Sequence, residues 1–418
     1  MHPQRTRAFI LIMSVYVLLV VSILSLSVSA RSLAETMTAR QYFWSDSAFS
    51  LAEASLDATM SNFRRANFNS VASTPMAGGS YWTEVTPLPA LGPRTYQLIG
   101  HGRRESIQRD LEAIVDATPI SVFQYPLFGD QLVDLRGNVE TDSFNSALGA
   151  YGVCLSDCTG ANPVYNIGSN GDISTNATSS DSDTSGPATV GLNISGNAVD
   201  INGQLNFGAG TTDPMETLTH SGSNQSGPDP NLISADPAAV SMSDPLLLPP
   251  VVVPAGLTCT DLTILSFQAV TLPPGEYCYQ DLNMGAPDAL GAIGPAVLNV
   301  TGEVTIYISG TLHASYASTI GNASRPSYTV FQLASPVGTT VTTATLTGTT
   351  QLYGAIYAPD STVTLGGTID IYGSITAYSI RQTGSAQVHY DEELQNRDEL
   401  IGGYTTDVIY WRERDLSE

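Results

Sequence analysis

The chain begins with an uninterrupted apolar run. Residues 8–30, AFILIMSVYVLLVVSILSLSVSA, carry no charge and are flanked by arginines on both sides. At 1.5 Å per residue a helix of this length spans a bilayer. We therefore predict a transmembrane anchor from Ala8 to Ala30, preceded by a short cytoplasmic segment at residues 1–7. A cleaved secretory signal is the alternative, but the apolar run is longer than an ordinary signal core.

Residues 31–66 continue with the three-and-four spacing of an amphipathic helix. This spacing predicts that one long helix runs from the membrane to about residue 66. Its apolar stripe is expected to pack either on a β domain of the same chain or on neighbouring subunits. The stripe consists of Ala48, Leu51, Ala52, Ser55, Leu56, Thr59, Met60 and Phe63, with Glu53, Asp57 and Arg64 outside it.

The next segment, residues 67–119, predicts a small α+β head. Its first part is rich in Gly, Pro and Ser. Two extended runs follow, Thr95 to Ile99 and Ile107 to Val115, joined by the Gly-containing turn GHGRR. Two such runs around a short glycine turn indicate a β-hairpin.

From about residue 120 the pattern changes to short alternating runs punctuated by Gly, Asn and Asp. Residues 345–358 and 364–377 share eight identities in fourteen positions. A period near 19 with glycine at the corners is typical of stacked β coils. We predict a right-handed β-helix, or solenoid, in two parts. These are residues 120–207 and 257–390, with a Pro, Asp and Ser rich connection at 208–256 that crosses or caps the stack, and a cap or tail at 391–418. The predicted fold class is thus mainly β with a long N-terminal helix.

The doubled phrase Tyr-Gly-small-Ile is interpreted as a pair of rungs in this scaffold. Ile side chains are expected to point inward, glycines to form corners, and the two tyrosines to stack on one another. The variable positions between the rungs are expected to contact any ligand: Gln351 against Asp370 and Tyr357 against Thr376. The rung residues are Tyr353, Gly354 and Ile356, repeated as Tyr372, Gly373 and Ile375.

The cysteines favour an oxidising compartment. Cys154 and Cys158 lie four apart, and Cys259 and Cys278 lie nineteen apart. Pairing of neighbours is the simplest of the three possible pairings. A zinc site made of four thiolates is the alternative, but neither pair has the spacing of a zinc knuckle. Disulfides place the bulk of the chain outside the cytoplasm.

The charge balance argues against nucleic acid as a partner. The chain has 39 acidic and 16 basic residues, no lysine, and a net charge of −23. Phosphate binding needs a basic face, and no Lys or Arg occurs between Arg136 and Arg325. This stretch is either a solvated acidic surface or a site for divalent cations.

Few residues support catalysis, so we expect no enzyme and no cofactor. Asp360 and Asp370, with Arg381 nearby, could serve a glycosidase, but Asp360 sits in a Pro-Asp turn where Asp is expected on backbone grounds. The cluster His389-Tyr390-Asp391, followed by two glutamates, could bind a metal. The alternative is a last coil capped by a helix start, where early acids are favourable.

The first 60 residues and the repeats resemble a known family. The segment RTRAFILIMSVYVLLVVSILSLSVSARSLAETMTARQYFWSDSAFSLAEASLDATM resembles the N-terminal region of PilX-type minor pilins of type IV pilus systems. Segments such as LPPGEYCYQDLNM and LYGAIYAPDSTVTLGGTIDIYGSITAYSI are similar to an uncharacterised β-solenoid-like domain found behind such anchors.

The resemblance implies a structural role. It implies a subunit held in the cell membrane by one N-terminal anchor, with an extracytoplasmic bulk, that assembles with other pilin-like subunits through its N-terminal helix. Presentation on a pilus, with adhesion to surface polysaccharide, is part of this hypothesis. The alternatives are an envelope-tethered β-helix enzyme acting on carbohydrate and a carbohydrate-binding adhesin that joins no filament.

Overall fold

The computed structural model describes most of the chain and divides it into two compact units. The described residues are 4–76, 78–159, 163–179, 190–195, 199–212, 219–220, 239–334, 342–397 and 400–414. The first unit contains Met1–Thr118 and Tyr404–Glu418, and the second contains Pro119–Gly403. We call them the head unit and the coil unit.

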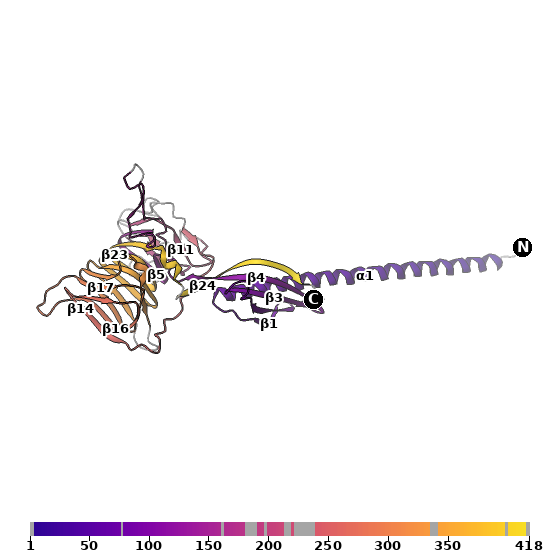
Figure 1. Cartoon of the computed structure of the whole chain (residues 1–418). Coiled ribbons are helices and arrows are strands. Elements are labelled where there is room, and N and C mark those ends of the chain that lie inside the picture. The colour runs from indigo at the N-terminus through magenta and orange to yellow at the C-terminus, as the bar shows by residue number, and fades with distance from the viewer. Residues whose placement is uncertain are drawn as a thin grey trace. The chain divides into compact units, whose positions relative to one another are not determined.

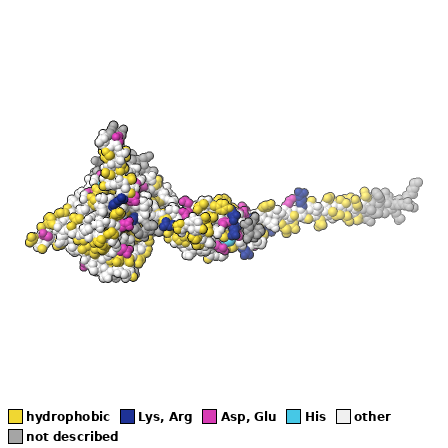
Figure 2. Space-filling model, viewed as in Figure 1, with side chains coloured by type: hydrophobic (Ala, Val, Ile, Leu, Met, Phe, Trp, Pro, Cys, Tyr) yellow, Lys and Arg dark blue, Asp and Glu magenta, His cyan; other side chains and the backbone are white. Residues whose placement is uncertain are grey.

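Helix α1 (Gln4–Arg64) is continuous (Figure 1). No glycine or proline interrupts it, so nothing in its sequence kinks the backbone. It contains one segment long and apolar enough to cross a membrane, and none of that segment is buried in the protein. Ala8 lies in this helix and Ala30 is exposed on it. Figure 2 shows hydrophobic side chains along this part of the helix.

The second half of α1 packs on a five-stranded sheet of the head unit. The predicted stripe is buried or half-buried, while Glu53 and Asp57 are exposed, so the stripe packs on a β sheet of its own chain. Glycines allow the close approach: a Cβ at Gly102 would meet the backbone carbonyl of Ala48. The sheet order is β1 (Val71–Met76), β2 (Gly79–Pro87), β3 (Thr95–Arg104), β4 (Ile107–Ser121) and β24 (Ile401–Arg414).

The last strand of this sheet comes from the C-terminal end of the chain. Within residues 391–418, predicted as a cap or tail, the described residues form the short 3₁₀ helix η2 (Glu392–Asn396) and then β24 beside β4. Arg412 Nε lies 2.8 Å from Glu112 Oε2, and the ring of Tyr404 packs against that of Phe68. The pairing of β24 was not predicted, because a partner nearly 300 residues away leaves no local signal in the sequence.

The coil unit is built from short strands that pair in parallel. Each group of three strands pairs in order with the next group: β17 with β20, β18 with β21, and β19 with β22. The three strands of the second group then pair with successive parts of β23. This is the pairing of stacked three-strand coils (Figure 1). The handedness of the coils stays a prediction.

The strands of the coil unit form one sheet of 17 members among the described residues, plus the small pair β6 (Cys154–Ser156) and β7 (Val164–Tyr165). Their bounds are β5 (Leu127–Phe144), β8 (Ile173–Thr175), β9 (Gly191–Ile194), β10 (Val199–Ile201), β11 (Leu205–Phe207), β12 (Thr219–His220), β13 (Ala239–Ser241), β14 (Thr260–Leu265), β15 (Ala269–Leu272), β16 (Gly275–Ala286), β17 (Ala296–Val300), β18 (Val304–Ile308), β19 (Thr311–Ala314), β20 (Ser318–Gly321), β21 (Thr329–Leu333), β22 (Thr343–Leu346) and β23 (Gln351–Asp391), with the 3₁₀ helix η1 (Pro326–Tyr328) before β21.

The order of coils in the stack differs from the order in the chain. β5 pairs in parallel with the last part of β23, from Ile375 beside Leu127 to Asp391 beside Phe144. The two predicted solenoid parts therefore belong to one stack. The chain enters its middle at β5, builds one half as far as β13, and then builds the other half from β14 back to β5.

The chain reaches β14 through an extended segment, residues 245–257, which we call the strap. Its prolines remove backbone donors, so it cannot join a ladder as a central strand. Its apolar side chains instead cover one outer face of the coils. The cluster contains Val251, Leu248 and Val253 of the strap with Tyr307, Val330, Ala355 and Tyr357 of the coils. Parts of the predicted 208–256 connection lie outside the described residues.

The covered face corrects one expectation. Tyr357 and Thr376 were expected to contact a ligand, but both are fully buried. Tyr357 donates its hydroxyl to the Pro249 carbonyl at 2.5 Å, and Thr376 donates to the Val122 carbonyl at 3.0 Å. The residue type differs between these two equivalent positions because Tyr357 bonds to the strap, whereas Thr376 bonds to the segment just before β5.

Both neighbour disulfides are confirmed. Cys154 pairs with Cys158 and Cys259 pairs with Cys278. The second bond joins the chain just after the strap to β16, beneath the apolar cluster that the strap covers. It therefore fastens the covering segment to the face that it covers.

Candidate functional site

The doubled Tyr-Gly-small-Ile phrase lies in two neighbouring coils. The rings of Tyr353 and Tyr372 stack with centroids 4.7 Å apart and 12° between planes. Ile356 and Ile375 are fully buried in the interior. A Cβ at Gly373 would meet the carbonyl oxygen of Gly354, so glycine is needed for the coils to approach. The two tyrosine rings thus cover one face of each other, and His389 lies beside Tyr372 as well.

This ring ladder ends in a closed polar group. His389 lies 4.8 Å from Tyr372 by ring centroids, and its Nδ1 is 2.7 Å from Asp142 Oδ1. Tyr151 donates its hydroxyl to the other oxygen of Asp142 at 2.5 Å. Burial raises the pKa of Tyr151, and the bond to Asp142 raises it further. The carboxylate of Asp142 is thus occupied by partners from its own chain.

The acidic groups that were weighed as metal or catalytic sites lie apart from one another or are bonded within the chain. Asp391 accepts bonds from the backbone N–H groups of Ser146 and Ser327, while His389 bonds to Asp142 on another strand. No group of three His, Cys, Asp or Glu side chains suited to a metal occurs in the described part of the chain. Asp370 accepts from Gln351 Nε2 at 3.2 Å, and Asp360 is exposed in its turn.

A second outer face of the coils carries a column of polar side chains in register. The pairings place these residues opposite one another from coil to coil. Within β23, the hydrogen bond between Thr362 and Ser379, 2.6 Å long, joins residues 17 apart in sequence. The same offset places Thr364 beside Arg381. Neighbouring members are separated by one strand spacing, about 4.8 Å. The polar column runs Thr263, Asn283, His313, Thr345, Thr364, Arg381, Asp134 and Asn193.

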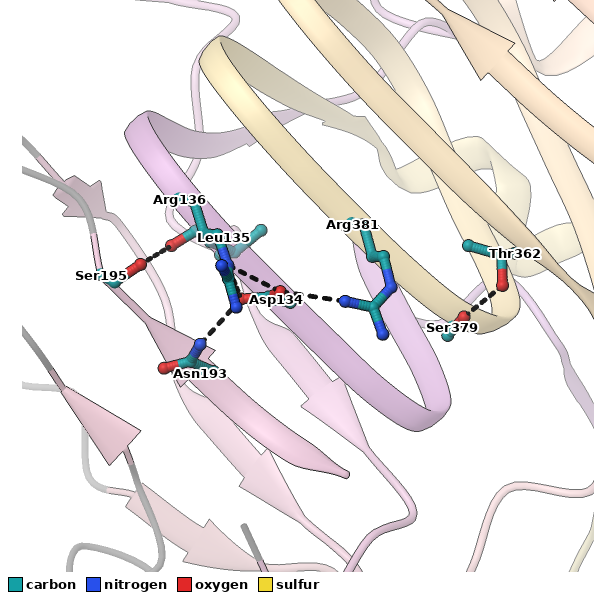
Figure 3. A network of polar contacts seen from close by, with 8 residues as sticks. All are labelled: Asp134, Leu135, Arg136, Asn193, Ser195, Thr362, Ser379 and Arg381. Carbon is teal, nitrogen blue, oxygen red and sulfur yellow. Dashed lines mark hydrogen bonds and ion pairs between the residues drawn. The ribbon is translucent and has the colours of Figure 1, made fainter. Parts of the chain in front are cut away.

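One end of the polar column is closed by its own bonds (Figure 3). Asp134 is 2% exposed and lies 2.9 Å from Arg136 Nε and 3.3 Å from Arg381. It also accepts from Asn193 Nδ2 at 2.7 Å. Two arginines and an amide thus converge on one carboxylate, and they compensate its burial. We call Asp134, Arg136, Arg381 and Asn193 the closed end.

The other end of the column opens into a cavity of about 730 Å³. Thr263, Asn283 and His313 line it from three successive coils. None of these three side chains takes part in a hydrogen bond within the described parts of the chain. We call them the open end. Because their donors and acceptors are unused, a ligand could bind them without breaking an internal bond.

Tyr316 forms an aromatic wall of the same cavity. Its side chain is 42% exposed, and its backbone has φ of 56°, in the left-handed region that only glycine adopts without cost. The next coil supports this conformation, because Thr349 N donates to the Tyr316 carbonyl at 2.7 Å. A Cβ at Gly348 would lie 2.5 Å from Tyr316 N. Strained backbone that neighbours hold in place is a feature of functional sites.

Sequence reasoning missed this column and its cavity. The one local signal is a repeated Thr-x-Thr, at Thr343 and Thr345 and again at Thr362 and Thr364. Its outward threonines extend the polar face over two coils. The remaining members differ in residue type and lie at unequal intervals, so only the pairing register brings them together.

Comparisons with known proteins give limited information. The family described as "Domain of unknown function (DUF7305)" matches residues 294–397, which includes the rungs and the middle of the polar column. No curated protein matches the chain. Among solved structures, the chain is similar to the competence-associated pilin ComZ from Thermus thermophilus. That match has 10% identity and a TM-score of 0.21, and it covers 89% of this chain and 97% of that one. A score of this size does not establish a common fold.

Proposed function

We propose that this protein is a membrane-anchored, extracytoplasmic, pilin-like structural subunit that presents its coil unit, a right-handed β-solenoid, at the cell surface. The observation that carries the proposal is helix α1. Its first part is apolar, exposed and long enough to span a bilayer. Its second part packs on the sheet of the head unit. One element thus joins a lipid-compatible segment to a folded domain.

Membrane fractionation with protease protection tests the anchor. We expect the full-length chain in the membrane fraction, with its bulk digested from the outer side only. Val20→Arg places a charge within the apolar segment, where it costs about 2.5 to 3.5 kcal/mol of insertion free energy. It should move protein out of the membrane fraction. Thr38→Arg, on the same helix beyond the apolar segment, is the matched control. Recovery of wild-type protein in the cytoplasm with free thiols would refute the proposal.

Subunit assembly is tested separately by site-specific photocrosslinking in cells. Phe43 is 61% exposed on α1 between the apolar segment and the packed stripe. A photoreactive residue at this position should capture other chains that carry an apolar N-terminal helix. The control position is Glu53, which is exposed on the side of the helix away from its sheet. Equal capture at both positions would count against assembly through the helix.

We further propose that the protein has no catalytic activity. The supporting observation is that its clustered polar groups, around Asp134 and Asp142, are engaged with one another. Turnover of a polysaccharide by the purified chain, abolished by Asp370→Asn, would instead favour an envelope-tethered enzyme. A binding role in adhesion is the second candidate function, because the open end of the polar column leaves unused hydrogen-bonding groups beside a cavity.

A further inference from the structure

We propose that the cavity at the open end of the polar column binds an uncharged saccharide chain. This inference rests on the second candidate function, binding at the open end, and names its ligand; it can hold or fail independently of the anchoring and assembly role. It is drawn from four features of the cavity: its unused polar groups, its aromatic wall, its lack of charge and its regular spacing.

The unused polar groups match hydroxyl ligands. Asn283 offers both a donor and an acceptor, Thr263 offers a hydroxyl, and His313 offers two ring nitrogens. They come from β14, β16 and β19, which pair with one another in the stack. A saccharide hydroxyl both donates and accepts, so it can bond to any of these groups. Binding sites that fix ligand orientation generally use a few such groups in a cavity of 300 to 1,000 Å³.

The aromatic wall suits the apolar face of a sugar ring. Tyr316 takes part in none of the ring contacts of the described residues, unlike Tyr353 and Tyr372, whose ring faces cover each other. Ala286 and Pro287, which are half-buried and exposed, add apolar surface beside it. Tyrosine provides a large contact area and loses little conformational entropy on binding. Since the Tyr316 backbone is bonded to Thr349 of the next coil, the ring's attachment point is fixed before the ligand arrives.

The charge of the cavity selects against ionic ligands. None of its lining residues is Asp, Glu, Lys or Arg, and no Lys or Arg occurs in the sequence between Arg136 and Arg325. An anionic ligand would therefore lack a cationic partner and would approach a chain of net charge −23. A metal cation would lack a carboxylate. An uncharged, hydroxyl-rich ligand meets neither obstacle.

The regular spacing suits a polymer. The lining groups repeat at one strand spacing, about 4.8 Å, which is close to the length of one sugar ring in a chain. The polar column continues past the cavity through Thr345 and Thr364. A chain of several sugar units could thus lie across successive coils and meet similar groups at each step.

The test is isothermal titration calorimetry on the full-length protein in detergent micelles. The probes are oligosaccharides from dextran, mannan and xylan, which are uncharged, and from polygalacturonate, which is anionic. We expect saturable binding of at least one uncharged probe and weaker or no binding of polygalacturonate. Tyr316→Ala should lower the affinity about tenfold through loss of the aromatic wall, and His313→Ala should also lower it.

Two variants keep the result interpretable. Tyr316→Phe retains the ring and should bind within about threefold of the wild type. Tyr378→Ala removes a tyrosine of similar exposure, 46%, that does not line the cavity, and it should bind like the wild type. The proposal is overturned if no uncharged probe binds, if polygalacturonate binds more tightly, or if Tyr316→Ala binds as well as Tyr378→Ala. None of these binding results bears on the anchoring role, which membrane fractionation tests separately.

Discussion

Two outer faces of the coil unit differ in what satisfies their side chains. One face is apolar and lies beneath the strap, where Tyr357 is fully buried. The other carries the polar column. Along that column the closed end is saturated by internal bonds to Asp134, while the side chains of the open end make no hydrogen bond among the described residues. Outward positions of one stacked scaffold can thus bond to one another in one place and remain available to a ligand in another.

The largest effect should come from the covered face. Tyr357→Ala removes a buried aromatic side chain and its bond to the Pro249 carbonyl, and it should lower the free energy of unfolding by about 4 kcal/mol. Urea denaturation followed by circular dichroism measures this. Tyr357→Phe, which removes only the hydroxyl, should lower it by about 1 kcal/mol. If Tyr357→Ala were as stable as Tyr357→Phe, the strap would not be packed on this face.

The disulfide of the covered face should have the next largest effect. Replacing Cys259 and Cys278 together with alanine removes a cross-link over 19 residues and should lower the free energy of unfolding by about 3 kcal/mol. The matched control replaces Cys154 and Cys158, which close a shorter loop. Its loss should be about 1 kcal/mol smaller. The same urea midpoints serve as the measurement, and the reverse order would contradict the strap-fastening role.

The closed end of the polar column should come third. Asp134→Ala leaves Arg136, Arg381 and Asn193 without their shared acceptor. Breaking a buried ion pair costs about 3 to 5 kcal/mol, and partial exposure of both arginines reduces this to about 2 kcal/mol. Thermal and urea denaturation both report it. Asp360→Ala, at an exposed turn, is the control and should change little.

The open end should contribute least to stability. Asn283→Ala and His313→Ala remove side chains with no internal hydrogen bond in the described residues, so each should change the free energy of unfolding by less than about 0.5 kcal/mol. The same denaturation series checks this. A loss as large as that of Asp134→Ala would erase the contrast between the two ends and mean that the open end serves cohesion.

Local patterns predicted local features well. The three-and-four spacing of Ala48, Ala52 and Phe63 identified the packed side of α1, because helix geometry alone decides which residues share a side. The offset between Tyr353 and Tyr372 identified their stacking, because one coil lies directly on the next. In each case the interacting residues are near in sequence or related by a short repeat.

Features that depend on distant pairing were not predictable in the same way. Nothing near Tyr357 shows that the strap covers it, and nothing near Asp142 shows that His389 lies beside it. The open end combines Thr263, Asn283 and His313, whose intervals follow loop lengths and not a repeat. Register between strands sets these contacts, and register depends on the whole stack.

The entry of the chain at the middle of the stack has a consequence for biogenesis. The Asp142 and His389 side chains bond across 247 residues, so β5 lacks its neighbour on one side until almost the whole protein has been synthesised. Contacts of such long separation form slowly. In the proposed membrane-anchored arrangement, the anchor leaves the ribosome long before β23 does. The two halves of the stack can join only after β23 has been made and has paired with β5.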